Sequence, residues 1–289
     1  MKRPFLLTSC VLLGLASSAC GSGGPAPDPG FQTEDAESVD LDNLRIRVSG
    51  RARVLPEAER WLAAQGQPTP TLGGVPIAIQ EPLRVAVNDD NPTFGTGTVE
   101  GDGAFAVEDV PVREVHQGLA TSLEGAGLVR TLTPVYDSVF TGARPRTDVI
   151  EASVWALPEQ FHDALGTAFG EPLLRGLTSD RARTLRDAGF VLGRVVDASG
   201  QPRAGVRVVP DRSELAERIF YPSADFNGVD QVGTSSDGLF IYVHTSLGAE
   251  TFRLGVEGDD TYVARNASVA PGWGFVLTVY PGVYAPAVP

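Results

Sequence analysis

Short apolar segments alternate with polar residues along the first half of the chain. Residues 44–48 place apolar and polar side chains in turn with a period of two, which is the pattern of a half-buried β-strand. Residues 56–65 depart from this pattern, because a proline and acidic residues occupy the first turn and Gly66 follows the end, and they predict one helix. The two-residue period predicts further strands over residues 74–79, 83–87 and 97–107.

A segment whose apolar residues have helical spacing lies between this region and a second strand-rich region. Residues 158–170 are expected to form a helix with one apolar face. That face consists of Phe161, Leu165 and Phe169. Ser179 is predicted to cap a second helix that ends at Gly189. We expect a helical hairpin that packs its apolar face onto the neighbouring β-structure; a partner-binding helix is the alternative.

The two-residue period returns in the last third of the chain. Asp197 and Gly200 supply the polar side chain and the positive φ of a tight turn between two strands. Gly238 serves a second turn, after which Phe240 and Tyr242 fall on one face of the next strand and are able to enter the core. Strands are predicted over residues 193–196, 204–209, 234–243 and 252–258.

Two motifs of this region resemble a known family. The segments GRVVDASGQPRAGVRV at residues 193–208 and TSSDGLFIY at residues 234–242 are similar to the opening and the hairpin of the carboxypeptidase regulatory-like domain. The resemblance implies a transthyretin-like β-sandwich. It implies no peptidase activity, because the zinc-bearing domain of that enzyme is separate and nothing in this chain matches it.

The first half resembles a diverged copy of this domain. Its residues 48–54, 74–79 and 101–105 mirror the opening strand, the next strand and the hairpin turn of the second half. A helical insertion replaces the turn after the opening strand. The sequence therefore predicts an all-β fold with two transthyretin/Ig-like β-sandwich modules, at residues 42–150 and 190–289, joined by a short helical hairpin within a connector at residues 151–189.

Residues 1–20 have the order of a secretory signal peptide. Lys2 and Arg3 precede an apolar stretch at residues 5–15, and small residues lead to Cys20. The stretch is shorter than the roughly 20 apolar residues of a transmembrane helix. We therefore expect export from the cytoplasm.

The end of this segment resembles the lipobox of bacterial lipoproteins, in which the cysteine carries the lipid. Residues 15–20 read LASSAC, with Ser17 where the motif usually has leucine. Ordinary cleavage after Ala19 is the alternative. Residues 21–41 follow as a flexible acidic Gly/Pro tether. The resemblance implies lipidation of Cys20 and anchoring to a membrane, and Gly21 favours the outer membrane or cell surface.

Charge and composition narrow the classes of function. The net charge of −13 at pH 7 creates a field that repels nucleic acid, so we expect no nucleic-acid partner. The 42% of hydrophobic residues exceeds what a disordered chain carries. The acidity does not identify a partner.

No arrangement of reactive residues indicates catalysis. Cys10 lies in the signal peptide and Cys20 is assigned to the lipid, so neither is left for a disulfide or a zinc site. His116, His162 and His244 lack metal-ligand spacing, and no serine-nucleophile motif is present. We expect no enzymatic activity and no cofactor or metal.

Two groups of side chains remain as candidate ligand sites. Asp89, Asp90, Asp259 and Asp260 cluster oxygen donors in expected loops, as a calcium site would, but such residues serve turns equally well. Aromatic residues could bind sugar, although their spacing near the last strand favours core packing. They are Trp155, Trp273, Phe275 and Tyr280.

The expected function is a non-catalytic, lipid-anchored cell-envelope scaffold whose β-sandwiches contact an unknown protein partner. The alternative is a carbohydrate-binding protein for cell-wall or secreted polysaccharide. The alternative requires exposed, coplanar aromatic rings, whereas the scaffold predicts that those rings are buried.

Overall fold

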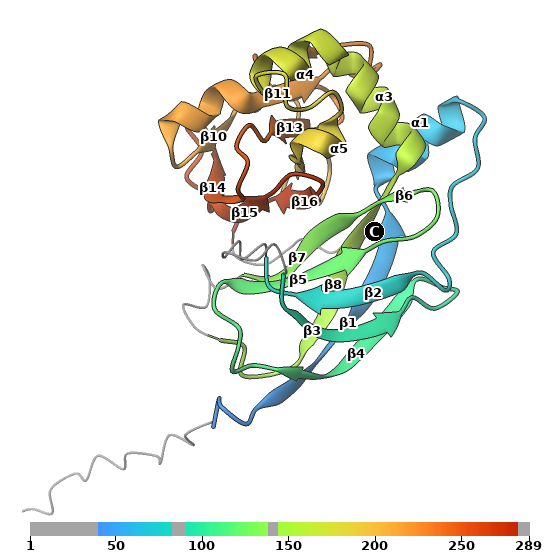
Figure 1. Cartoon of the computed structure of the whole chain (residues 1–289), viewed down its shortest axis with the longest axis vertical. Coiled ribbons are helices and arrows are strands. Elements are labelled where there is room, and N and C mark those ends of the chain that lie inside the picture. Colours follow the sequence, from blue (N-terminus) through green and yellow to red (C-terminus); the bar gives the residue numbers. More distant parts are fainter. Residues whose placement is uncertain (1–39, 83–90, 138–143, 283–289) are drawn as a thin grey trace, which may run out of the picture. The chain divides into compact units, whose positions relative to one another are not determined.

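β-Strands make up most of the regular structure in the computed structural model, which describes residues 40–82, 91–137 and 144–282 (Figure 1). The described residues belong to the compact unit formed by residues 39–289. The expected signal peptide and the expected strand over residues 83–87 lie outside the described residues.

The first half forms two layers that share one core. One layer has the strand order β4-β1-β8-β6, and the other contains β7-β5-β2-β3. Val48 of β1 and Ile79 of β2 are both fully buried in this core. Apolar and polar residues alternate along these strands because every second side chain points into the core. The elements are β1 (Arg45–Val54), α1 (Pro56–Ala64), β2 (Pro76–Gln80), β3 (Thr93–Thr98), β4 (Ala104–Pro111), β5 (Gly118–Leu123), β6 (Leu128–Val129), β7 (Thr131–Asp137) and β8 (Val149–Pro158).

The second half contains the helices and a second pair of sheets. Strands β12-β11-β13-β9-β16 form one sheet region and β10-β14-β15 form the other. The elements are α3 (Glu159–Phe169), α4 (Glu171–Leu177), α5 (Leu185–Ala188), β9 (Phe190–Val195), β10 (Val208–Pro210), the 3-10 helix η1 (Ser213–Arg218), β11 (Ile219–Pro222), β12 (Val229–Asp230), β13 (Leu239–Val243), β14 (Glu250–Val256), β15 (Arg265–Val269) and β16 (Gly274–Val279).

The two halves repeat one strand order. β1 pairs antiparallel with β4 and parallel with β8, and β9 pairs antiparallel with β13 and parallel with β16. In the facing layers, β2-β5-β7 and β10-β14-β15 are antiparallel in the same order. The mirrored sequence segments therefore occupy matching places in two sandwiches.

One glycine in each half shows how close this correspondence is. The carbonyls of Gly103 and Gly238 accept hydrogen bonds of 2.8 Å from the amides of Ala52 and Val195, respectively. Both glycines have positive φ, 86° and 67°, and a Cβ at either would lie within 2.6 Å of the carbonyl oxygen of the same partner. Only glycine fits this turn in both halves.

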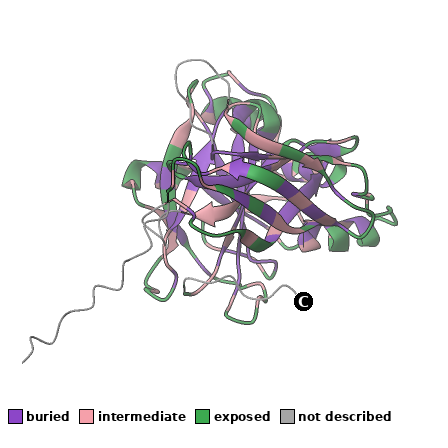
Figure 2. Cartoon of the chain, turned by 90° about the horizontal axis from the view of Figure 1, so that it is seen from below, coloured by how far each residue is buried: buried purple, intermediate pink, exposed green. Residues whose placement is uncertain are grey.

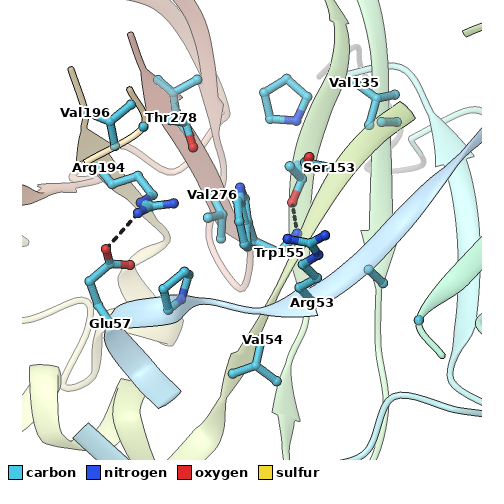
Figure 3. A pocket seen from close by; sticks show the side chains of 18 of the residues that line it. Arg53, Val54, Glu57, Val135, Ser153, Trp155, Arg194, Val196, Val276 and Thr278 are labelled. Atoms are coloured by element: carbon cyan, nitrogen blue, oxygen red, sulfur yellow. Dashed lines mark hydrogen bonds and ion pairs between the residues drawn. The ribbon is translucent and has the colours of Figure 1, made fainter. Parts of the chain in front are cut away.

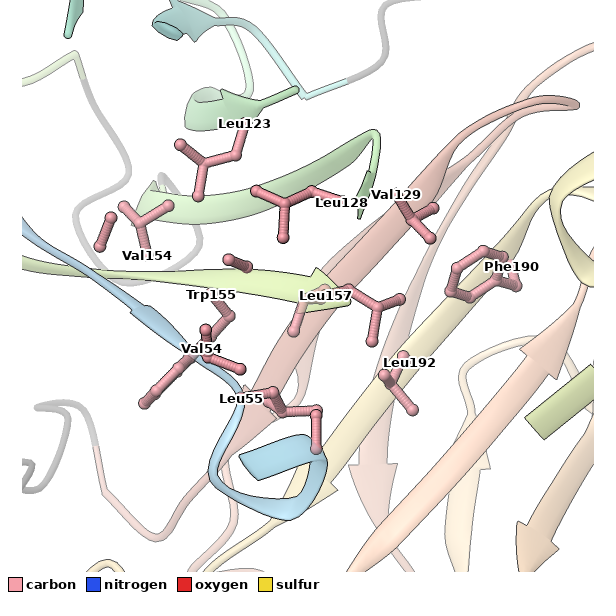
Figure 4. Close-up of a cluster of buried hydrophobic side chains, with 14 of the residues drawn as sticks. Val54, Leu55, Leu123, Leu128, Val129, Val154, Trp155, Leu157, Phe190 and Leu192 are labelled. Carbon is pink, nitrogen blue, oxygen red and sulfur yellow. The ribbon is translucent and has the colours of Figure 1, made fainter. Parts of the chain in front are cut away.

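A single hydrogen-bonded sheet crosses from one half to the other. β16 pairs in parallel with β7, and this junction joins strands of both halves into a nine-stranded sheet. Hydrophobic side chains continue across the same boundary, since Phe190 and Leu192 pack in one cluster with Leu157 and Val129 (Figure 4). The module boundaries at residues 150 and 190 stay a prediction, but the modules share a sheet and a core.

The turn chemistry predicted for the second half is confirmed. Asp197 Oδ1 accepts hydrogen bonds from the amides of Ser199 and Gln201. Phe240 and Tyr242 are fully buried together in the core between β13 and the β10-β14-β15 layer. Figure 2 shows buried and exposed positions alternating along several strands, with further exposed positions in loops and on helix surfaces.

Helix α1 lies where residues 56–65 predicted a helix, and α3 buries Phe161, Leu165 and Phe169 as expected. Phe169 contacts Phe220 of β11 with ring centroids 5.1 Å apart, so α3 covers one face of the second half's sheet (Figure 1). Among the described residues, no helix has the length and apolarity to span a bilayer.

Three details of the helical region correct the sequence interpretation. Ser179 has a positive φ of 51° and begins no helix; Thr184 caps α5 by accepting a hydrogen bond from the Asp187 amide. Helix α4 was not predicted. Residues 151–158 of the expected helical connector belong to β8, because their side chains are needed in the core beside β1.

Candidate binding cleft

A cleft with a volume of about 1010 Å³ lies between the two halves. Strands β1, β7 and β8 line it from the first half, and β9 and β16 line it from the second (Figure 3). Figure 3 shows Arg194 and Thr278 on one side, Val135 and Ser153 on the other, and Trp155 between them. The volume is at the upper end of the range of small-ligand pockets.

The cleft opens where the shared sheet splits. Within the described residues, the pairing of β7 with β16 covers two residue pairs, Thr131 with Gly274 and Leu132 with Phe275. Beyond these pairs β7 stays bound to β5 and β16 stays bound to β9. Residues 133–137 and 276–278 then line the cleft from opposite sides.

The far end of the split is bridged by side chains. Asn266 of β15 donates from Nδ2 to Asp137 Oδ1 at 2.7 Å. Nearby, Arg265 donates to the carbonyl of Tyr280 and places its guanidinium 3.7 Å from the centre of that ring. The end of β7 is therefore held against β15 of the second half.

A buried ion pair lies in the wall of the cleft. Arg194 Nη2 of β9 is 3.0 Å from Glu57 Oε1 of α1, and the two side chains are 8% and 0% exposed. The Arg194 guanidinium also lies 5.3 Å from the Trp155 ring. Glu57 Oε2, Arg194 Nε and Thr278 Oγ1 are buried without a hydrogen-bond partner. Such groups carry a desolvation cost that a polar ligand would relieve.

Helix α1 positions Glu57. Pro56 begins the helix, which places Glu57 in the first turn with its side chain toward β9. One turn later, Arg60 Nη2 binds Asp237 Oδ1 at 2.8 Å and holds the helix on the turn before β13. Burial raises the pKa of the Glu57 carboxyl, an effect that Arg194 opposes.

The mouth of the cleft has an irregular backbone. The register of β1 against β8 shifts between Val48 and Gly50, so that Ile150 and Glu151 of β8 stand opposite the single residue Ser49 of β1. Glu151 has a φ of 57°, which is uncommon for a residue with a side chain, and Ile150 is 67% exposed. A bulge that exposes an apolar side chain beside a cleft is typical of a binding surface.

The candidate aromatic residues do not form an open platform. Trp155 and Phe275 are 4% and 1% exposed, so the predicted core packing of Phe275 is confirmed. Arg130 lies 3.5 Å from the centre of the half-buried Trp273 ring, and Arg265 covers Tyr280.

The candidate acidic loops do not form one group. Asp89, Asp90 and Cys20 lie outside the described residues. Asp259 accepts hydrogen bonds from Arg203 and from Thr261, and these bonds lower the pKa of its carboxyl, Thr261 contributing most. Asp260 is exposed. In the described ranges no three His, Cys, Asp or Glu side chains gather as metal ligands would.

The histidines lie away from the cleft. His244 is buried, with Nδ1 3.0 Å from Glu250 Oε2 and Nε2 2.7 Å from the Gly248 carbonyl, so the ring secures the loop before β14. His162 Nδ1 bonds to Asp163 Oδ1 at 3.0 Å, and burial lowers the pKa of His162.

Sequence reasoning missed Glu57 and Arg194 as site residues. Glu57 looks like an ordinary first-turn acid. Arg194 carried a weak signal, since it is the only charged residue in the otherwise apolar strand β9, whose six residues are all buried. A charge in a buried strand requires a partner, but the sequence does not show which one.

Comparison with known proteins adds no identification. No protein-family model matches the sequence, and no curated protein matches it. Solved structures give distant likenesses. The shaft pilin spaA from Lactobacillus rhamnosus GG has 12% identity and a TM-score of 0.23 over 84% of this chain and 100% of that chain.

Two other pilins are similar to the same degree. The minor pilin GBS52 of Streptococcus agalactiae has 11% identity and a TM-score of 0.22 over 84% of this chain and 99% of that chain. A streptococcal ancillary pilin has 12% identity and a TM-score of 0.23, covering 82% of this chain and 69% of that chain. TM-scores this low do not establish a shared fold.

Proposed function

We propose that the protein is a non-catalytic, lipid-anchored scaffold outside the cytoplasm. Its two β-sandwich modules, of the carboxypeptidase regulatory-like type, would act as one rigid unit that contacts another protein. The observation that carries this proposal is the parallel pairing of β16 with β7, because it joins both modules in one hydrogen-bonded sheet. Domains joined only by a linker would move independently.

Ion pairs support a rigid junction. The buried Glu57–Arg194 pair and the Arg60–Asp237 pair, in which the Arg60 side chain is 56% exposed, both connect α1 of the first module to the second module. Breaking the buried pair costs several kcal/mol, about 3–5, so that contact resists separation of the modules. The exposed pair contributes less. A rigid unit is what a scaffold needs to hold a partner in a fixed orientation.

The hydrogen bonds of two carboxylates, Glu81 and Glu250, support a non-catalytic role. Glu81 is fully buried and accepts hydrogen bonds of 2.7 Å from the amides of His116 and Gln117. Glu250 binds Tyr242 and Arg218 beside His244. In both places the carboxylate holds the fold, and neither carboxylate lines the cleft.

Lipid anchoring is tested by substitution of the two cysteines. Cys20→Ala should move the protein from the membrane fraction to the soluble fraction, since the cysteine of the lipobox-like segment, which would carry the lipid, is removed. Cys10→Ala is the matched control, because it removes a thiol from the same segment and leaves the lipobox-like residues intact. Membrane association of both variants alike would contradict the anchor.

A further inference from the structure

We infer that the cleft between β7 and β16 binds an extended peptide segment of a partner protein. The segment would add a strand along the edge of β16 that β7 leaves unpaired beyond Phe275, in the mode known as β-augmentation. This inference rests on the proposed function as a protein-interaction scaffold and names the site at which the partner binds.

An open strand edge lines the cleft. β16 is paired with β9 along its whole length, but within the described residues its pairing with β7 ends at Phe275, so its other edge beyond that residue has no strand partner. Residues 276–278 of β16 line the cleft. Such an edge offers backbone donors and acceptors in a row, which an extended chain can pair with. On the β7 side Pro134 has no backbone N–H, so β16 is the edge that suits an added strand.

The backbone of β7 is irregular at the cleft. Leu119 pairs with Tyr136 and Ala120 pairs with Pro134, so Val135 is an extra residue without an opposite residue on β5. The bulge of β8 at Ile150 and Glu151 lies at the same cleft. Two irregular strands at one opening keep the sheet from closing there.

Three polar side chains of the cleft each have a buried atom without a hydrogen-bond partner. Glu57 Oε2 accepts hydrogen bonds, Arg194 Nε donates them and Thr278 Oγ1 does both, and all three are buried without a partner. Glu57 is 1% exposed and Arg194 is 7% exposed, and both line the cleft. Peptide groups and neutral polar side chains supply donors and acceptors together, as this set requires.

The same pair restricts the chemistry of the peptide. Glu57 and Arg194 neutralise each other at 3.0 Å, so a charged side chain entering the cleft would find no net opposite charge there. At the mouth, Ile150 and Val135 offer apolar surface. The structure thus favours an extended segment with a neutral polar residue facing the ion pair and an apolar residue at the mouth.

A peptide fits this cleft better than a polysaccharide. Sugar rings stack on open aromatic faces, but Trp155 is 4% exposed and the Tyr280 ring is covered by the Arg265 guanidinium at 3.7 Å. The strand edges, by contrast, match a peptide backbone.

A displayed library of random linear peptides, selected against the detergent-solubilised full-length protein, tests the inference. We expect selected peptides to bind the wild type, and Ile150→Asp to weaken that binding at least about tenfold. Val232→Asp is the matched control, since Val232 is 81% exposed and does not line the cleft. Ser153→Trp, which fills the cleft, should abolish binding, and hydrogen exchange should show bound-state protection of amides in β7 and β16.

The outcomes separate this inference from the proposed function. Selected peptides that bind all three variants as tightly as the wild type would overturn the cleft site and leave the scaffold in place, with its partner elsewhere. Failure to select any peptide would also overturn the inference. Binding of a soluble cell-wall polysaccharide that Ser153→Trp abolishes would overturn both.

Discussion

Arg194 of β9 and Glu57 of α1 stand 137 positions apart in the chain and form a buried ion pair of 3.0 Å. Each residue belongs to a different half, so the pair fixes the inserted helix of the first sandwich to the opening strand of the second. The pair also lines the cleft. One contact therefore connects the stability of the junction to the proposed binding site.

Removal of one member of this pair should destabilise the protein strongly. Glu57→Leu leaves the Arg194 guanidinium buried without its carboxylate partner. Arg194→Met leaves the Glu57 carboxylate buried without its guanidinium partner. Each should lower the free energy of unfolding by about 3–5 kcal/mol, whereas the double variant should lose much less than the sum. Urea unfolding of the four proteins measures this cycle, and additive losses would contradict a direct interaction.

Two glycines should respond in opposite directions to the same substitution. A Cβ at Gly193 would lie 1.9 Å from Cζ of Phe240, which is fully buried, so Gly193→Ala should cost about 1–3 kcal/mol. Gly166 lies inside α3 with no atom within 4 Å of its would-be Cβ, and Gly166→Ala should stabilise by about 0.5–1 kcal/mol. Thermal unfolding of both variants tests the packing around β9.

The free energy of unfolding should decrease as the pH is lowered, in part through His162. Burial holds the pKa of His162 in the folded state below the ordinary 6.5, opposed by Asp163, while Nε2 is buried without a partner. In the window below 6.5 the unfolded chain binds more protons than the folded one, so stability is complete above 6.5 and is lost as the pH falls.

His162→Phe should remove this part of the pH dependence, because phenylalanine does not titrate. The substitution keeps an aromatic ring beside Phe190, whose ring centroid lies 5.4 Å from that of His162 in the wild type. The measurement is the free energy of unfolding of both proteins from about pH 8 to about pH 5, where most carboxylates stay ionised. Equal slopes for variant and wild type would show that His162 does not contribute.

The continuous sheet predicts one unfolding transition. Because β16 is hydrogen bonded to β7 and both halves share a hydrophobic cluster, separation of the modules would expose Phe190 and Leu192 to water. Tryptophan fluorescence and far-UV circular dichroism should therefore report coincident transitions in urea. Two separated transitions would mean that each sandwich unfolds alone.

The local elements follow from the pattern of side chains along the chain. The two-residue period located β1, β9 and β13, and the four-residue spacing of Phe161, Leu165 and Phe169 located α3. Asp197 determined a turn, because its side chain bonds to amides only a few residues away. These features depend on neighbours in the chain, which is why the pattern of side chains predicts them. Ser179 was a wrong cap because Thr184 competes within the same segment.

How the halves meet depends on the tertiary structure. Any edge strand offers the same backbone groups, so nothing in residues 131–137 indicates β16 as a partner. Glu57 resembles any first-turn acid, and Arg194 stands out in an apolar strand without indicating its partner, until the fold brings the two to 3.0 Å. The cleft follows from the same cause, since it exists where two paired strands diverge. Partner choice between distant edges depends on the shapes of both sandwiches together, and that information is spread over the whole chain.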